Sequence, residues 1–83
     1  MNQILVQIYL PANGIYYDVY VPDHVCIVEV TELLADLFTE ISNGFFVRDD
    51  INYLCQRDKG EGFPPEKTLR ELNVKNGSKL IFI

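Results

Sequence analysis

The sequence of 83 residues is poor in the side chains from which most catalytic and metal sites are built. It contains one histidine, His24, and two cysteines, Cys26 and Cys55. Two cysteines so far apart form neither a disulfide framework nor a metal ligand set, and His24 has no third ligand nearby. We expect no cofactor, no metal and no enzyme activity. The cysteines are interpreted as small buried hydrophobic residues in a reducing compartment.

The chain also lacks a long hydrophobic run. No apolar stretch approaches the ~20 residues of a membrane span, and Met1-Asn2-Gln3 lacks the basic region of a signal peptide. Apolar residues still make up 48% of the chain, which excludes a disordered protein. The length is that of one small domain, residues 1–83. We expect this domain to be soluble and cytoplasmic, with no direct membrane insertion.

Basic residues are scarce in the first half of the chain. The net charge is −5, and residues 1–50 hold eight acidic residues against a single base, Arg48. Residues 51–83 hold six bases against four acids. The acidic half argues against nucleic acid as a partner. A surface with two oppositely charged sides would suit a protein partner, although a merely solvated surface is equally compatible with these charges.

Two alternating segments open the chain. Residues 3–10 and 15–21 alternate apolar and polar positions, as half-buried strands do. Asn13-Gly14 between them tolerates the positive φ of a tight turn. Asp18 sets the register of the second segment, because a carboxylate in this position should face water. The chain therefore begins with a β-hairpin.

A helical pattern follows the hairpin. Apolar residues recur with helical spacing over about 15 residues, with Gly44 as the expected left-handed cap. Glu29, Glu32, Asp36 and Glu40 lie off the apolar stripe, and none has a base four positions later. The exposed helix face is therefore expected to be purely acidic. The apolar stripe consists of Ile27, Val30, Leu34, Leu37 and Ile41, widened by Leu33 and Phe38.

The second half of the chain predicts a strand at 51–56, a short helical turn at 66–72 and a last strand at 79–83, with a turn at Asn76-Gly77 before it. Together with the hairpin and the helix, this order indicates an α+β fold. The last strand fits best between the first and third strands, parallel to the first. The result is a β-grasp: a mixed four-stranded sheet of order 2-1-4-3, one long helix and a short helical turn.

Several motifs resemble those of ubiquitin-like proteins over nearly the whole chain. They are Val21-Pro22-Asp23 after the second strand, Thr68-Leu69-x-x-Leu72-x-Val74, and Leu80-x-Phe82 in the last strand. Within the ubiquitin-like (β-grasp) superfamily, the chain looks most like the YukD/EsaB proteins of Gram-positive bacterial type VII (WXG-type) secretion systems. The resemblance implies a cytosolic accessory or regulator that binds protein partners, such as a membrane-bound secretion component.

A C-terminal Gly-Gly tail, through which ubiquitin and sulfur carriers act, is missing. The chain ends Leu80-Ile81-Phe82-Ile83, inside the last predicted strand. Bulky side chains would clash in the narrow channel of an activating enzyme, where only glycine fits. We expect a non-conjugating adaptor. A small modifier or sulfur-carrier protein is the disfavoured alternative.

Alternation also predicts a binding face. If Leu80 and Phe82 face the helix, then Ile81 and Ile83 face the opposite, open side of the sheet. An apolar patch there would mark an interaction site, and in ubiquitin the same face binds most partners. A homodimer through this face, or a register error, is the alternative. The sequence does not decide whether Phe45 and Phe46 lie in the core or are exposed. The predicted protein-binding residues are Leu5, Tyr9, Tyr16, Tyr20, Leu54, Ile81 and Ile83.

Overall fold

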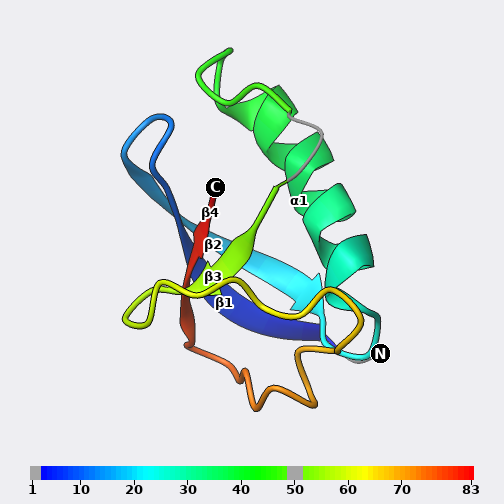
Figure 1. The fold of residues 1–83 in the computed structure, drawn as a ribbon. Helices are drawn as coiled ribbons and strands as arrows, with labels where there is room; N and C mark the ends of the chain where they lie inside the picture. The colour runs from blue at the N-terminus through cyan, green and yellow to red at the C-terminus, as the bar shows by residue number, and fades with distance from the viewer. Residues whose placement is uncertain (1–2, 49–51) are drawn as a thin grey trace.

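The computed structural model describes residues 3–48 and 52–83. One helix lies across one face of a sheet, and no other described helix or strand covers the opposite face (Figure 1). The elements follow in the order β1 (Gln3–Leu10), β2 (Ile15–Pro22), α1 (Ile27–Ile41), β3 (Leu54–Gln56) and β4 (Lys79–Phe82).

The strand order in the sheet is β2-β1-β4-β3. Strand β1 pairs antiparallel with β2 and parallel with β4, while β3 pairs antiparallel with β4. The predicted mixed sheet of the β-grasp is therefore confirmed. The predicted Asn76-Gly77 turn also fastens β1, because Asn76 Oδ1 accepts from Leu5 N at 2.7 Å and Gly77 N donates to Leu5 O at 2.8 Å.

The hairpin turn uses the two residues that the sequence indicated. Gly14 has φ of 71°, in the left-handed region that glycine adopts without strain, and its N–H donates to Leu10 O at 2.9 Å. Asn13 Oδ1 accepts from Ile15 N at 3.2 Å, and Asn13 Nδ2 donates to Tyr17 Oη at 2.9 Å. The asparagine thus ties the turn to a side chain on the core side of β2.

The end of α1 decides the open question about the two phenylalanines. The helix passes into left-handed backbone at Asn43 (φ 55°) and Gly44 (φ 87°), so the predicted cap at Gly44 is preceded by a second left-handed residue. Ser42 Oγ then accepts from Phe46 N at 2.9 Å. This bond turns Phe46 into the core, where it is 6% exposed, and leaves Phe45 67% exposed.

The core lies between α1 and the covered face of the sheet, and Phe38 is at its centre. The Phe38 ring lies 5.2 Å from the ring of Tyr17, 6.3 Å from that of Phe46 and 5.6 Å from that of Phe82 (centroid distances). The stripe predicted for α1 is confirmed in part: Leu33 is 55% exposed because the helix rests on its Leu34 side, and Ile41 at the end of the helix is 41% exposed. The buried core comprises Val6, Ile8, Leu10, Val21, Ile27, Val30, Leu34, Ala35, Phe38, Phe46, Leu54, Leu69, Val74, Leu80 and Phe82.

The short helical turn predicted at 66–72 does not form a helix. Leu72 N donates to Thr68 O, but Asn73 N donates to Arg70 O and Val74 N to Leu69 O, so no helical repeat is established. A φ of 60° at Asn73 ends the segment. The residues just before these turns cap α1 instead: the N–H groups of Ile27 and Val28 donate to Lys67 O at 2.7 Å and Pro65 O at 3.1 Å.

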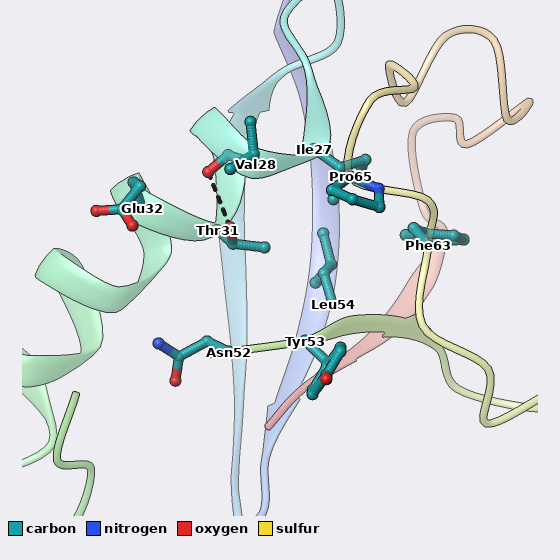
Figure 2. A pocket seen from close by; sticks show the side chains of 9 residues that line it. All are labelled: Ile27, Val28, Thr31, Glu32, Asn52, Tyr53, Leu54, Phe63 and Pro65. Carbon is teal, nitrogen blue, oxygen red and sulfur yellow. Dashed lines mark hydrogen bonds between the residues drawn. The ribbon is translucent and has the colours of Figure 1, made fainter. Parts of the chain in front are cut away.

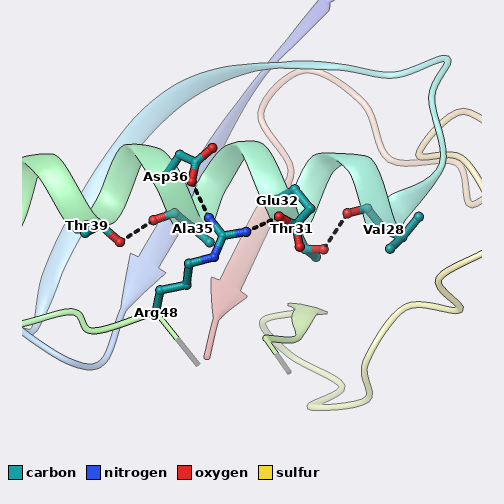
Figure 3. Close-up of polar contacts among 7 residues, drawn as sticks. All are labelled: Val28, Thr31, Glu32, Ala35, Asp36, Thr39 and Arg48. Carbon is teal, nitrogen blue, oxygen red and sulfur yellow. Dashed lines mark hydrogen bonds and ion pairs between the residues drawn. The ribbon is translucent and has the colours of Figure 1, made fainter. Parts of the chain in front are cut away.

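The third strand is shorter than predicted, and the helix surface is not purely acidic. Strand β3 begins at Leu54, and residue 51 of the predicted strand lies outside the described residues. Arg48 pairs with both Glu32 and Asp36 (Figure 3). The prediction missed these ion pairs because it considered only bases one helical turn away, whereas Arg48 reaches the helix from the connector that follows it.

Candidate protein-binding face

The open face of the sheet is made of rows of side chains that run across the strands. One row runs from Tyr16 on β2 through Tyr9 on β1 and Ile81 on β4 to Cys55 on β3. The rings of Tyr9 and Tyr16 lie 4.8 Å apart, centroid to centroid. Burial raises the pKa of the Cys55 thiol, which keeps it in its neutral form beside these apolar neighbours.

A second row on the same face is polar. It contains Asp18, Gln7 and Lys79, which are register partners across β2, β1 and β4. The row ends at Arg57, just after β3, whose N–H donates to Lys79 O at 3.0 Å. Tyr20 and Leu5 pair beyond this row. The term open face is used below for Leu5, Gln7, Tyr9, Tyr16, Asp18, Tyr20, Cys55, Arg57, Lys79, Ile81 and Ile83.

The predicted face residues lie together, with one exception. Tyr16, Tyr20 and Ile83 are 58%, 66% and 60% exposed, and Leu5, Tyr9 and Ile81 are half-buried among them. Binding of a protein by this face stays a prediction.

The prediction that Leu54 lies on the open face of the sheet is wrong. It pairs with Phe82, whereas its neighbour Cys55 pairs with Ile81. Residues that face each other across two strands point to the same side of the sheet. Leu54 therefore shares the covered face with Phe82 and is 1% exposed in the core. A shift of one residue in the assumed register is enough to produce this error.

Arg57 belongs to the open face but was not among the predicted residues. Its Nη1 donates to Gln7 Oε1 at 2.9 Å, and its Nη2 lies 3.2 Å from Gln7 O and 3.4 Å from Leu80 O. Its Cζ atom lies 4.9 Å from the ring centre of Tyr16, which is a cation–π geometry. Alternation along the sequence could not have found it, because the prediction placed Leu54 on the open face, whereas Arg57 shares a face with Cys55.

A separate hollow of about 390 Å³ lies between the first turns of α1 and the segment around β3 (Figure 2). Its apolar lining includes Val28, Leu54, Phe63 and Pro65, and its rim includes the polar Thr31. Thr31 Oγ1 donates to Val28 O at 2.9 Å, a bond within the helix that keeps the hydroxyl group satisfied.

Two further features are absent from residues 3–48 and 52–83. No group of three or more histidine, cysteine, aspartate or glutamate residues in this part of the chain is placed to hold a metal ion. Within the same ranges, no helix has the length and apolar character needed to cross a membrane.

No protein-family model and no curated protein matches the sequence. Solved structures do match the fold. The ubiquitin-like domain of EccD5 from Mycobacterium xenopi is 19% identical, with a TM-score of 0.81 over 100% of this chain and 94% of that one. Ubiquitin from Caldiarchaeum subterraneum is 18% identical, with a TM-score of 0.73 over 99% and 92% of the two chains.

A larger assembly also contains a similar domain. A chain of the MycP5-free ESX-5 inner membrane complex is 17% identical, with a TM-score of 0.81, over 100% of this chain but 21% of that one. The chain is thus an α+β protein of the β-grasp class. More narrowly, its fold is that of ubiquitin, as the sequence resemblance predicted. The closer resemblance to the YukD/EsaB proteins stays a prediction.

Proposed function

We propose that this chain is a cytoplasmic ubiquitin-like adaptor that docks through its open face onto a protein component of a type VII secretion system. It acts by non-covalent recognition, neither conjugated to its partner nor catalysing a reaction. The partner is a membrane-bound component of the secretion machinery, reached from the cytoplasmic side.

The observation that carries this proposal is the uncovered aromatic surface of the sheet. Tyr16, Tyr20 and Ile83 are more than half exposed around the half-buried Tyr9 and Ile81. Contiguous apolar surface of this kind marks interaction sites on small proteins, and tyrosine is enriched among residues that dominate binding energy. Since the core is complete without these side chains, their grouping is better explained by a partner than by stability.

The link to secretion rests on fold likeness and on the sequence resemblance to the YukD/EsaB proteins. The similar domains include one from EccD5 and one within a chain of the ESX-5 inner membrane complex. Because both sequences are less than 20% identical to this chain, their similarity supports a shared fold but does not identify a partner for this chain. The link to secretion therefore needs its own test.

A photo-crosslinking side chain can test the docking face in the native host. Placed at Tyr20, it should form adducts with a membrane component of the secretion system. Placed at Leu33, which is 55% exposed on the helix side, it serves as a control of similar exposure and should not. Adducts of equal yield and identity from both positions would disprove docking through the open face.

Two further measurements separate the alternatives. Genes for WXG-type proteins and an FtsK-like ATPase beside this gene would support the secretion link, and their absence would remove most of its support. Immunoblots of host cells should show a single band. A ladder of heavier bands resistant to denaturant would support the modifier alternative instead.

A further inference from the structure

The open face contains a half-buried positive charge that no carboxylate of the described chain neutralises. The ion pairs among described residues join Arg48 to Glu32 and Asp36, and Arg70 to Asp23. His24 Nδ1 also lies 3.8 Å from Asp23 Oδ1. Arg57 takes part in none of them. Within residues 3–48 and 52–83, its guanidinium hydrogen-bonds to neutral groups, the amide oxygen of Gln7 and two backbone carbonyls, and lies over the ring of Tyr16.

The Arg57 guanidinium is held in place although it lacks a counter-charge. Three hydrogen bonds to two strands and the ring of Tyr16 fix its plane on the sheet. Its Nε atom is buried, with no acceptor among the described residues. A pre-positioned guanidinium loses little conformational freedom when it binds a carboxylate, which is the anion that its geometry fits best.

The surrounding charge favours the same kind of ligand. Lys79 lies in the same row as Arg57 and also forms no ion pair with a described residue. Asp18 is the only acidic residue in that row. The row that crosses the centre of the open face therefore has a net charge of +1, from Arg57 and Lys79 against Asp18, although the whole chain has a net charge of −5. Asp58 lines a hollow together with both bases, but it forms no ion pair with a described residue. Complementary charge at an interface steers encounter and fixes the register of the partner.

We infer that the open face binds a partner segment in which a carboxylate is flanked by apolar side chains. The carboxylate approaches Arg57 and Lys79, and the apolar side chains lie on Tyr9, Tyr16 and Ile81. This inference rests on the proposed docking function and adds the chemistry of the partner. A second copy of this chain suits the face less well, because two identical positive centres would meet in a symmetric dimer.

Selection from a library of short random peptides tests the inference without knowledge of the partner. The full chain is immobilised, and recovered peptides are sequenced and assayed individually. We expect enrichment of aspartate or glutamate next to leucine, isoleucine or aromatic residues. Replacing that acid by its amide in a recovered peptide should weaken binding to the chain about tenfold, as for other close charge pairs.

The matched variants are Arg57→Gln and Arg70→Gln. Both remove one positive charge, but Arg70 pairs with Asp23 away from the open face. With Arg57→Gln, the acid and amide peptides should bind within about twofold of each other, whereas Arg70→Gln should preserve the tenfold difference. Asp18→Asn should tighten binding of the acid peptide. If Arg57→Gln fails to fold, Lys79→Gln and the loss of affinity at high salt give the same readout.

The outcomes separate this inference from the docking proposal. If Tyr20→Ser weakens the binding of the recovered peptides but these peptides show no preference for an acidic residue, the inference is overturned and docking through the open face is still supported. Peptides indifferent to Tyr20→Ser, or no recovered peptides, would overturn both. A concentration-dependent dimer in sedimentation, abolished by Tyr20→Ser, would identify a second copy as the occupant and overturn the acidic partner.

Discussion

The two faces of the sheet are built from alternate residues of the same strands, yet they differ in almost every physical respect. On the covered face, Ile8, Leu80 and Phe82 have no exposed surface. On the open face, Tyr16 and Tyr20 remain mostly exposed. The covered face is aliphatic and aromatic apart from Gln56, the register partner of Leu80, whereas the open face mixes tyrosine with a positive centre. One face thus supports the fold, and the other is free to recognise a partner.

The largest expected difference in stability is between substitutions at two neighbouring residues, Phe82 and Ile83. Phe82→Ala removes a fully buried ring from the core and should lower the free energy of unfolding by about 3–5 kcal/mol. Ile83→Ala, on the open side, should change it by about 0.5 kcal/mol or less. Urea denaturation of both variants measures the difference. Comparable losses would mean that the two faces do not divide stability and recognition as described.

A second pair tests the corrected position of Leu54. Leu54→Ala should cost about 2–5 kcal/mol, since the residue is 1% exposed in the core. Tyr20→Ala, a residue predicted for the same face but 66% exposed, should cost about 0.5 kcal/mol or less. Thermal unfolding followed by circular dichroism distinguishes them. A small effect at Leu54 would restore the original assignment to the open face.

The helix side provides a weaker test of the contrast between paired and unpaired arginines. Arg48→Gln breaks the ion pairs with Glu32 and Asp36, which are exposed and screened by solvent. The loss should be about 1 kcal/mol or less and should shrink further as salt is added. Unfolding midpoints at low and high ionic strength measure it. A salt-independent loss would indicate packing of the Arg48 side chain rather than charge.

The smallest effect lies away from both faces, at Glu71. Its pKa is lowered chiefly by the hydrogen bond from the Thr68 backbone N–H, at 2.9 Å, with a further contribution from the Thr68 hydroxyl. Because the folded pKa lies below the unfolded one, this stabilisation is present above the unfolded pKa and is lost as pH falls through the folded pKa. The difference in stability between the wild type and Glu71→Gln should therefore narrow in acid. A difference unchanged by pH would exclude this linkage.

Local patterns predicted the parts of the molecule that depend on nearby residues. Alternation located β1 and β2, helical spacing located α1, and Asn13-Gly14 and Asn76-Gly77 located their turns. Asp18 correctly assigned Tyr16 and Tyr20 to the open face. In each of these cases, the residues of one segment and its neighbour in the sequence are enough to predict the local structure.

Three of the failures involve contacts between distant segments. Leu54 faces the core because of its register with Phe82 on the last strand, and a short strand has too few residues to display its own alternation. Arg48 lies in the connector after α1 and pairs with Glu32 and Asp36, which are 16 and 12 positions earlier in the sequence. Arg57 crosses two strands to reach Tyr16, although it follows β3 in a turn. None of these partners is within helical or hairpin distance in the sequence.

The sequence by itself determined the β-grasp fold, because turn residues, period and element order leave few ways to bury the apolar residues together. Only the tertiary structure decided which side of the sheet each residue of β3 occupies and where the Arg57 charge lies. Side-chain period specifies a face only once the register is known, and register is a property of two strands. The positive centre of the open face therefore exists only where β1, β4 and the end of β3 meet.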